Sequence, residues 1–415
     1  MKYGLIGYPL KHSFSKEIHN KLGNQNYELN ELNPDDFDSF MKKRDFLGIN
    51  VTIPYKEKVI PYLDVIDEKA KKINAVNTIV QRDGKLYGYN TDYYGLQSII
   101  QKNNINLKNK NVLILGTGGT SKTASSVALD LGAKIFKAST RDGYDYKYDN
   151  LGKAYEDIDV IINTTPNGMY PHNFDDCLVD LSKFNHLDAV IDCIFNPIRT
   201  KLIIKAQELN KKTATGLYML VTQAVYANSK FFNIDDDKTI EKIETIYKTL
   251  KEAKESITLI GMPSCGKSSL ARILSSRLNR EYYDSDKEIE KIIGTKIANF
   301  LTKENEIEFR KIESDVIKEL STKTNVIIAT GGGVILNKEN IDNLKQNSRI
   351  YFINRSLKYL KATKDRPLSS NIDALKQKYE ERLPLYIKYS DKIIDGDNEF
   401  DQKVIEIIDD FTHNK

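Results

Sequence analysis

A glycine-rich turn at residues 261–268, GMPSCGKS, carries the most specific chemical signal in this chain. It fits the pattern G-x-x-x-x-G-K-[S/T] completely and follows the apolar segment 257–260. In such a turn backbone N–H groups surround phosphate oxygens, Lys267 reaches the outer phosphates, and Ser268 is a ligand of Mg²⁺. We interpret Cys265 as a small residue that fits the turn rather than as a redox switch. The predicted nucleotide contacts are Gly261, Ser264, Cys265, Gly266, Lys267, Ser268 and Ser269.

Carboxylates, glycines and arginines downstream of this turn are candidates for a phosphotransfer site. Asp284 and Asp286 lie two residues apart at an expected strand end, so their side chains share one face. One carboxylate can serve Mg²⁺ while the other orients an attacking hydroxyl, although a solvated acidic turn gives the same pattern. Three consecutive glycines after another apolar strand allow close backbone approach to a small substrate. These are Gly331, Gly332 and Gly333; for Arg310, Arg366 and Arg382 the alternative is a charged surface.

A second glycine-rich turn, at residues 116–121, also follows an apolar strand and precedes a helix. Gly116, Gly118 and Gly119 would allow a tight turn and close approach of pyrophosphate to the helix N-terminus. The third glycine of G-x-G-x-x-G is replaced by Ser121, so the pattern alone is weak. The next strand, 134–138, runs into Ser139, Thr140 and Arg141, and a cation there favours NADP, although the following Asp142 could weaken that preference.

Polar side chains upstream could bind a hydroxylated substrate. In GINVTIPYK at 48–56 the alternation places Asn50 and Thr52 on one face of a strand, and Lys56 follows its end. Asp83-Gly84 is a strong two-residue hairpin signal. That hairpin would place Asn77 opposite Asn90, with Asp92 just beyond the strand; a polar surface hairpin is the alternative.

Short apolar strands alternate with helical stretches throughout, which predicts an α/β fold with parallel sheets. Two nucleotide turns on one chain indicate two enzyme modules. The helical segment 238–254 has one apolar face and runs almost directly into the strand at 257–260. We therefore expect the modules to meet near residues 252–256.

Composition narrows the class of protein. The 415 residues have 40% hydrophobic and 29% charged content, which suits two or three soluble domains. The net charge of +4, with both signs mixed along the chain, gives no sign of a nucleic-acid surface. No apolar run is long enough for a membrane helix, and the N-terminus lacks signal-peptide features. The three cysteines and five histidines suggest neither a disulfide framework nor a His/Cys metal site. We expect a cytoplasmic enzyme without nucleic-acid or membrane partners; its oligomeric state is open.

Six ordered motifs in residues 1–250 together resemble shikimate dehydrogenase. They are GYPLKHSFSKEIHN at 7–20, GINVTIPYK at 48–56, NAVNT at 74–78, GYNTD at 88–92, INTTPNGM at 162–169 and GLYMLVTQA at 216–224. The resemblance implies a substrate domain over 1–100, completed by helices at 217–252, and a Rossmann NADP-binding domain over 101–216.

The same resemblance implies roles for individual residues. Ser13 and Ser15 would hold the substrate carboxylate, and Lys56 with Asp92 would form the catalytic pair. The residues expected to bind the ring hydroxyls are Thr52, Asn77, Asp92 and Gln223. The family usually has Tyr after the strand expected at 189–195, where this chain has Phe195, a departure that would weaken substrate binding.

Residues 256–415 resemble shikimate kinase. Besides the phosphate turn, the matching elements are the Asp-Ser-Asp sequence, FRKIE at 309–313, the triple glycine, DRPL at 365–368 and ERLPLY at 381–386. The resemblance implies that Asp286 binds the ring hydroxyls and is the candidate base, and that Asp284 contacts Mg²⁺ through water. Arg310 and Arg382 would bind the carboxylate, and Arg366, in a lid, would meet the phosphoryl group. The lid segment is short and has Lys361 or Lys364 in place of an arginine usually found near adenine, which puts the adenine contacts in doubt.

The predicted function is therefore bifunctional. NADPH would reduce 3-dehydroshikimate to shikimate, and MgATP would then phosphorylate shikimate to shikimate 3-phosphate. One alternative is a quinate/shikimate dehydrogenase that uses NAD, fused to the same kinase. Another is a metabolite sensor that keeps both folds without the chemistry, but Lys56, Asp92, Lys267 and Asp286 are all present.

Overall fold

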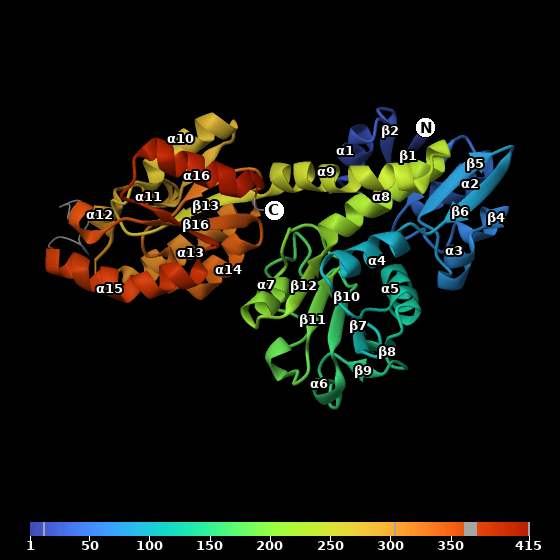
Figure 1. The fold of residues 1–415 in the computed structure, drawn as a ribbon, viewed down its shortest axis with the longest axis horizontal. Coiled ribbons are helices and arrows are strands. Elements are labelled where there is room, and N and C mark those ends of the chain that lie inside the picture. Colours follow the sequence, from blue (N-terminus) through green and yellow to red (C-terminus); the bar gives the residue numbers. More distant parts are fainter. Residues whose placement is uncertain (11–12, 303, 361–371, 414–415) are drawn as a thin grey trace. The chain divides into compact units, whose positions relative to one another are not determined.

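The computed structural model describes residues 1–10, 13–302, 304–360 and 372–413, and the chain divides into two compact units. Unit 1 comprises Met1–Asn196 and Leu202–Leu250, and unit 2 comprises Pro197–Lys201 and Lys251–Lys415. Figure 1 labels their helices and strands. Within the described residues no helix is long and apolar enough to cross a membrane.

Unit 1 contains a mixed sheet built from the first part of the chain. Its strand order is β2-β1-β3-β5-β6-β4. The strands are β1 (Tyr3–Gly7), β2 (Tyr27–Glu31), β3 (Gly48–Val51), β4 (Val65–Ile66), β5 (Thr78–Arg82) and β6 (Lys85–Tyr89), and the helices between them are α1 (Ser15–Lys21), α2 (Phe37–Lys43) and α3 (Glu68–Ile73). The β5–β6 hairpin turns at Asp83 and Gly84, both with positive φ, and pairs Thr78 with Tyr89. The predicted hairpin register is thereby confirmed, and it brings Asn77 and Asn90 to one strand end.

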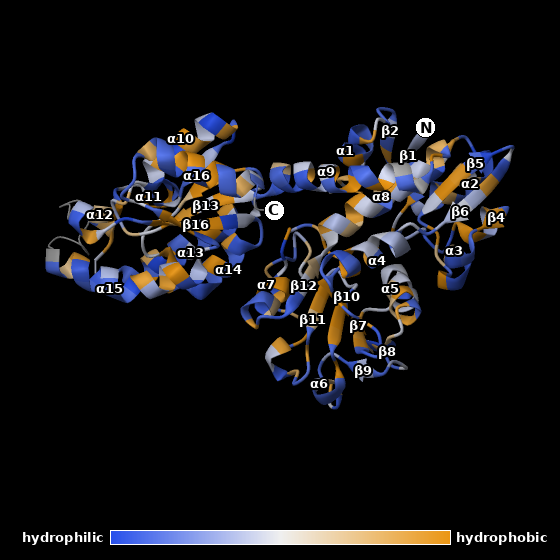
Figure 2. Cartoon of the chain, viewed as in Figure 1, coloured by the Kyte–Doolittle hydropathy of each residue, from blue (hydrophilic) through white to orange (hydrophobic). Residues whose placement is uncertain are grey.

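A second, parallel sheet in unit 1 follows the Rossmann pattern of strands and crossover helices. Its order is β12-β11-β10-β7-β8-β9. The strands are β7 (Asn111–Leu115), β8 (Lys134–Ser139), β9 (Tyr146–Lys147), β10 (Val160–Asn163), β11 (Ala189–Asp192) and β12 (Lys212–Thr215), with helices α5 (Gly119–Asp130), α6 (Ala154–Asp157) and α7 (Lys201–Glu208). The strands β10 and β11 are buried along their whole length, and Figure 2 colours both of them mainly as hydrophobic. β11 ends at Asp192, so the strand predicted over 189–195 is too long and Phe195 lies in the loop after it.

Three further helices complete unit 1. They are α4 (Asp92–Lys102), α8 (Gly216–Phe232) and α9 (Asp236–Lys254), whose last residues pass into unit 2. α8 packs along α4, whose first residue is Asp92. A side chain from α8 can therefore lie beside the residues that end the β5–β6 hairpin.

Unit 2 has a parallel sheet with the order β14-β15-β13-β16-β17. The strands are β13 (Ser256–Ile260), β14 (Tyr282–Asp284), β15 (Ile327–Ala329), β16 (Ser348–Asn354) and β17 (Lys392–Asp395). The helices are α10 (Lys267–Leu278), α11 (Ser285–Ile293), α12 (Ile297–Phe300), α13 (Glu306–Thr322), α14 (Lys338–Lys345), α15 (Ile372–Tyr389) and α16 (Phe400–His413). The predicted α/β class with parallel sheets is confirmed. Because all five strands are parallel, the loops after β13, β14 and β15 meet at one edge of the sheet.

A short segment from within the dehydrogenase-like sequence also belongs to unit 2. In Pro197–Lys201 the Arg199 N–H donates to the Gln346 carbonyl at 2.9 Å, and the Ile198 N–H donates to the Asn347 side-chain oxygen at 3.2 Å. Arg199 also donates from its guanidinium to the carbonyl of Ser348. No pattern in the sequence indicated that this segment would join the second compact unit.

Candidate functional sites

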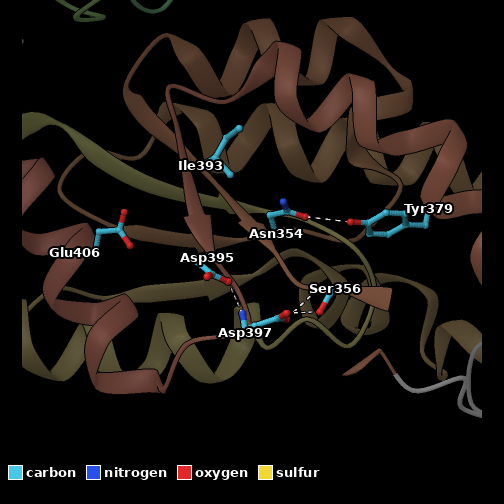
Figure 3. Close-up of a pocket in the computed structure, with 7 residues that line it drawn as sticks. All are labelled: Asn354, Ser356, Tyr379, Ile393, Asp395, Asp397 and Glu406. Atoms are coloured by element: carbon cyan, nitrogen blue, oxygen red, sulfur yellow. Dashed lines mark hydrogen bonds between the residues drawn. The ribbon is translucent and has the colours of Figure 1, made fainter. Parts of the chain in front are cut away.

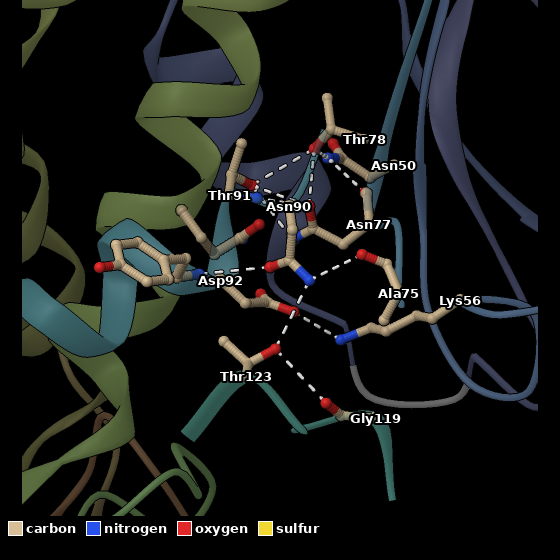
Figure 4. A network of polar contacts seen from close by, with 12 residues as sticks. Asn50, Lys56, Ala75, Asn77, Thr78, Asn90, Thr91, Asp92, Gly119 and Thr123 are labelled. Carbon is tan, nitrogen blue, oxygen red and sulfur yellow. Dashed lines mark hydrogen bonds and ion pairs between the residues drawn. The ribbon is translucent and has the colours of Figure 1, made fainter. Parts of the chain in front are cut away.

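A lysine–carboxylate pair lies where β3 and α4 meet in unit 1 (Figure 4). Lys56 donates from Nζ to Asp92 Oδ2 at 2.6 Å, and both side chains are largely buried, with 16% and 12% of their surfaces exposed. The low exposure strengthens the ion pair relative to one on the surface. The pair therefore combines a proton donor with a fixed counter-charge, as general acid–base chemistry requires.

A buried hydrogen-bond network fixes the strand ends beside this pair. Asn77 donates to Thr91 Oγ1 at 3.0 Å and accepts from the Thr91 N–H at 2.7 Å. Asn50 donates to Thr78 Oγ1 at 3.0 Å and accepts from the Tyr27 hydroxyl at 2.7 Å. Asn77 and Asn50 are thus held from several directions.

Asn90 completes the network at the first turn of α4. Its amide donates to the Ala75 carbonyl at 2.9 Å, and its side-chain oxygen accepts from the Tyr93 N–H at 3.3 Å. Sequence reasoning placed Asn90 opposite Asn77 but assigned no role to Thr78, Asn90 or Thr91. The available signal was that these polar residues lie together at the strand ends of the predicted hairpin.

The remaining predicted substrate residues of unit 1 lie on separate elements. Ser15 is buried as the first residue of α1, and its N–H donates to Ser13 Oγ at 3.2 Å. Thr52 follows the end of β3 and contacts Gly7, where an added Cβ would come within 2.4 Å of its methyl group. Gln223 on α8 lies against Gly95 of α4 and donates to the Leu220 carbonyl at 2.9 Å.

The glycine-rich turn of unit 1 lies beside the ion pair. A Cβ built on Gly119, the first residue of α5, would be 3.7 Å from Lys56 Cδ, while one on Gly118 would meet open space. Gly116 has a φ of +105°, a conformation that an L side chain rarely adopts. The open backbone at the N-terminus of a twelve-residue helix suits the pyrophosphate of a dinucleotide.

The cation predicted to select the cofactor is exposed at the end of β8. The Arg141 N–H donates to Ser139 Oγ at 3.1 Å. Asp142, which could have opposed Arg141, instead pairs with Lys147 Nζ at 2.7 Å. The pairing of Asp142 with Lys147 leaves a positively charged strand end, which fits the 2′-phosphate of NADP.

In unit 2 the phosphate turn curves tightly around its own lysine. Lys267 is buried at the start of α10, and its Nζ donates to the carbonyls of Gly261 and Met262 at 2.8 and 2.9 Å. Ser264 and Gly266 both have positive φ, which bends the backbone between the strand and the helix. Cys265 is buried, with its sulfur 3.6 Å from Lys267 Nζ.

Most of the other predicted kinase residues line one cavity of about 610 Å³ in unit 2. Asp284 is the N-cap of α11, where its Oδ1 accepts from the Asp286 N–H at 3.1 Å. Asp284 and Ser268 both face the cavity, and their oxygens are the ligand type that Mg²⁺ prefers. The predicted residues on its lining are Ser268, Asp284, Asp286, Arg310, Gly331, Gly332, Gly333 and Arg382; Arg366, Lys361 and Lys364 lie outside the described residues.

The triple glycine brings the backbone between two charged groups of this cavity. A Cβ on Gly331 would lie 2.4 Å from Asp286 Oδ1, and one on Gly333 would lie 2.4 Å from Arg310 Nη1. The Gly332 carbonyl accepts from Arg382 at 3.0 Å and from the Tyr386 hydroxyl at 2.6 Å. The three glycines thus let the backbone pass close to Asp286 and to Arg310.

Glu313 is buried on the lining of this cavity. In the sequence analysis it appeared only as part of the FRKIE motif. Its carboxylate accepts from Arg310 at 2.8 Å. Burial raises the pKa of the Glu313 carboxyl above its ordinary value, although the charge of Arg310 opposes that shift. Glu313 thus holds Arg310 against the cavity wall.

A second cavity of about 440 Å³ lies at the ends of β16 and β17 (Figure 3). It is lined by Asn354, Ser356, Tyr379, Ile393, Asp395, Asp397 and Glu406, none of which was predicted as a site residue. Its carboxylates have local partners, since Asp397 accepts from the Ser356 N–H at 2.9 Å and Asp395 accepts from the Asp397 N–H at 2.9 Å. We assign this cavity no function.

Comparison with known proteins identifies both halves of the chain. Residues 5–79 match the family model "Shikimate dehydrogenase substrate binding domain", and residues 263–412 match "Shikimate kinase". Shikimate dehydrogenase (NADP(+)) of Clostridium beijerinckii is 39% identical over 264 residues, which are 59% of this chain and 97% of that protein. The corresponding enzyme of Methanocaldococcus jannaschii is 33% identical over 276 residues, 60% of this chain and 97% of that protein.

Solved structures give the same result for the N-terminal part. Shikimate dehydrogenase 1 from Peptoclostridium difficile is 39% identical with a TM-score of 0.54, covering 60% of this chain and 98% of that one. A chorismate mutase/shikimate 5-dehydrogenase fusion protein from Clostridium acetobutylicum is 33% identical with a TM-score of 0.54, covering 60% and 97%. That second structure is itself a fusion of two enzymes.

Proposed function

The chain belongs to the shikimate dehydrogenase family and carries a shikimate kinase domain at its C-terminal end, and from this premise we propose how its residues perform the two reactions. It is a bifunctional enzyme of the shikimate pathway. It reduces 3-dehydroshikimate to shikimate with NADPH and phosphorylates shikimate to shikimate 3-phosphate with ATP. The observation that carries the proposal is that one chain holds two sites. One is the Lys56–Asp92 pair, and the other is a complete phosphate turn beside a cavity lined by both acidic and basic side chains.

In the dehydrogenase, Lys56 and Asp92 are the proposed catalytic pair. NADPH supplies a hydride to the carbonyl carbon of the substrate, whose oxygen becomes a hydroxyl. Lys56 Nζ holds a proton at the end of β3 for that oxygen, and Asp92, 2.6 Å away, fixes the ammonium and accepts from a ring hydroxyl. Ser13 and Ser15 would donate to the substrate carboxylate, and Thr52, Asn77 and Gln223 would bind the other ring hydroxyls.

The cofactor of the dehydrogenase is NADP(H). We propose that Gly116, Gly118 and Gly119 admit the pyrophosphate at the N-terminus of α5. Thr140 and Arg141 would bind the 2′-phosphate, with the charge of Asp142 offset by Lys147. The proximity of Gly119 to Lys56 supports a cofactor bound next to the proton donor.

In the kinase, Asp286 is the proposed base. It lies in the first turn of α11 and lines the cavity, where it can orient the attacking hydroxyl of shikimate and accept its proton. Lys267 and the backbone of the phosphate turn would bind ATP, together with Gly261, Ser264, Cys265, Gly266, Ser268 and Ser269. Mg²⁺ would offset the phosphate charge, held by Ser268 and, through water, by Asp284. Arg310 and Arg382 would bind the substrate carboxylate, and Arg366 would meet the phosphoryl group.

The partners of the chain are the small-molecule substrates of both reactions. As part of the proposal we place the enzyme in the cytoplasm, where NADPH and ATP are available, without nucleic-acid or membrane partners. Among the described residues Cys193 and Cys265 are free thiols, which suits a reducing compartment.

A sequential assay on the purified chain tests the proposed function. 3-Dehydroshikimate and NADPH are supplied first, and oxidation of the nicotinamide is followed by absorbance; MgATP is then added and shikimate 3-phosphate is measured. We expect NADPH oxidation without ATP and product phosphorylation only after ATP is added. Ligand binding without turnover of either cofactor would instead support the metabolite-sensor alternative.

A further inference from the structure

The last residues of two neighbouring strands in the Rossmann sheet of unit 1 form a buried polar pair. Asn163 ends β10 and Asp192 ends β11, and the two are register partners. Only 2% and 0% of their surfaces are exposed, and Asn163 Nδ2 donates to Asp192 Oδ1 at 3.1 Å. Burial of an amide and a carboxylate costs free energy, which their hydrogen bond offsets. None of the roles described above uses this pair.

Each member of the pair also holds the loop that follows its own strand. Asn163 Oδ1 accepts from the Thr165 N–H at 3.1 Å and from the Thr165 hydroxyl at 2.7 Å. Asp192 Oδ1 accepts from the Ile194 N–H at 3.0 Å, and the Asn163 carbonyl accepts from the Cys193 N–H at 3.1 Å. The pair therefore joins the loop after β10 to the loop after β11.

These two loops reach other functional parts of unit 1. In the loop after β10, Thr164 Oγ1 would lie 2.8 Å from a Cβ built on Gly116, so this loop packs against the dinucleotide turn. In the loop after β11, the Ile194 carbonyl accepts from the Gly216 N–H at 3.0 Å, and Phe195 follows directly. A displacement of the pair would thus be felt on both sides.

The loop after β11 is also close to the proposed catalytic pair. Burial raises the pKa of the Cys193 thiol, and the charges of Asp92 and Lys56 act on the same thiol. A dinucleotide extends across the carboxyl ends of the strands in a Rossmann sheet. Its 2′-phosphate is proposed at the end of β8, on one side of β7, so the nicotinamide would lie on the other side, over β10 and β11.

We propose that Asn163 and Asp192 are positioning residues of the dehydrogenase, and that their buried hydrogen bond fixes the two loops that hold the nicotinamide end of NADP(H). The inference rests on the proposed dehydrogenase function. Neither side chain is assigned a contact with the reacting atoms, because the pair acts through the backbone of Thr165 and Ile194. Without it the loops could separate, and the nicotinamide would be held less precisely beside Lys56.

The test exchanges the two side chains in the full chain. Asn163→Asp places two carboxylates against each other where an amide donated before, and like charges in a buried site repel. Adding Asp192→Asn restores a carboxylate–amide pair in reverse order, with oxygens still available to the N–H groups of Thr165 and Ile194. Asn163→Ser removes the amide without adding a charge, so it serves if Asn163→Asp does not fold.

The matched control is Asn111→Asp, the same chemical change at the opposite edge of the same sheet. Asn111 begins β7, and its amide donates to the Asp157 carbonyl at 2.8 Å. The dissociation constant of NADPH is measured by fluorescence titration and kcat by NADPH oxidation, both at pH 8 to disfavour a proton shared between two carboxyls. Kinase turnover of each variant reports the amount of intact chain.

Asn163→Asp and Asn163→Ser should each raise the dissociation constant of NADPH about tenfold and lower kcat about tenfold, because a buried hydrogen bond to a carboxylate contributes about that factor. The KM for 3-dehydroshikimate should stay nearly unchanged. The double variant should recover most of both losses, and Asn111→Asp should behave as wild type.

Two results would overturn the inference: a double variant as impaired as Asn163→Asp, or equal losses in Asn111→Asp. A wild-type chain that binds NADPH without oxidising it in the presence of 3-dehydroshikimate would instead overturn the proposed dehydrogenase function.

Discussion

The two candidate sites of this chain balance charge in opposite ways. In unit 1 Lys56, the proposed proton donor, and Asp92 pair with each other at 2.6 Å, beside a framework of buried neutral hydrogen bonds. In unit 2 Arg310 pairs with Glu313 at 2.8 Å, whereas Arg382 donates to the Gly332 carbonyl and has no ion pair among the described residues. The two charges of the first site offset each other. In the second site the guanidinium of Arg382 is available for an anion.

The difference indicates how each site recognises a substrate with a carboxylate. In the dehydrogenase the groups proposed to hold that carboxylate are the hydroxyls of Ser13 and Ser15, so recognition there depends on neutral hydrogen bonds. In the kinase the groups proposed to hold it are the guanidinium groups of Arg310 and Arg382, so recognition there depends on charge. Removing charge from the protein or from the substrate should therefore affect the two activities unequally.

The largest effect should come from breaking the ion pair of unit 1. Lys56→Met removes the proposed proton donor and should lower the dehydrogenase kcat about 10²- to 10⁴-fold, the usual contribution of general acid–base catalysis. Lys58→Met is the matched control, since Lys58 is exposed and its ammonium lies 5.9 Å from the centroid of the Tyr55 ring. Steady-state NADPH oxidation and kinase turnover are both measured. Loss of kinase turnover in Lys56→Met would contradict the independence of the sites.

The corresponding change in unit 2 is Lys267→Ala. Loss of an ammonium that stabilises phosphate charge should lower kinase turnover at least about a hundredfold. Dehydrogenase turnover should remain at the wild-type rate, because the hydrogen bonds of Lys267 within the described residues all go to the phosphate turn. Parallel loss of both activities in this variant would count against two separate sites.

The free energy of unfolding of unit 1 should depend on pH because His19 is buried in its neutral form. His19 stacks on Tyr27 at 3.9 Å between centroids, and burial lowers its pKa from 6.5 to about 3, against the Asn228 and Asn50 side chains. The unfolded state therefore binds a proton that the folded state excludes as the pH falls below 6.5. This group should make unit 1 about 2 kcal/mol less stable at pH 5 than at pH 7.

His19→Gln, which cannot be protonated, should remove that part of the pH dependence. Hydrogen exchange of peptides from α1 and β2 across a urea series reports the stability of unit 1 separately from unit 2. If wild type and His19→Gln lose the same stability between the two pH values, His19 is not the group responsible.

Arg141 provides a charge test within the dehydrogenase itself. Arg141→Ala should raise the KM for NADPH about tenfold, because it removes a cation from the proposed 2′-phosphate contact, and should leave the KM for NADH almost unchanged. Asp142→Asn should change little, since its exposed pairing with Lys147 is weak. Equal effects of Arg141→Ala on both cofactors would place the 2′-phosphate elsewhere.

The smallest expected effect concerns the ring of Phe195. Phe195 packs against Phe14 at 5.3 Å between centroids, next to Ser13 and Ser15. Phe195→Tyr adds a hydroxyl near the proposed substrate position and should lower the KM for 3-dehydroshikimate about threefold, the effect of one neutral hydrogen bond. Dehydrogenase kinetics at several substrate concentrations measure it, and an unchanged KM would show that the enzyme does not need this hydroxyl.

Local patterns in the sequence predicted the parts of the sites that depend on neighbouring residues. Residue spacing and backbone conformation determine both the phosphate turn around Lys267 and the hairpin at Asp83-Gly84. Both could therefore be predicted from a few neighbouring residues. The pairing of Lys56 with Asp92, 36 positions apart, followed only from the family resemblance. No local pattern could have supplied it.

Other features depend on contacts that spacing does not reveal. Asn50 is held by Tyr27, 23 positions away, so the sequence showed its face but not its place in a buried network. Arg382 is one of 62 lysines and arginines, and its contact with the Gly332 carbonyl appears only when α15 and the triple glycine come together. The length of the strand before Phe195 was overestimated because apolar residues continue past Asp192.

The most direct test of the contrast between the sites is to measure both activities of one wild-type sample with shikimate and with its carboxamide. The dehydrogenase is assayed in the oxidative direction with NADP, and the kinase with MgATP. We predict that the loss of charge raises the kinase KM at least about tenfold and the dehydrogenase KM about threefold or less. Equal losses at the two sites, or a larger loss in the dehydrogenase, would contradict the account.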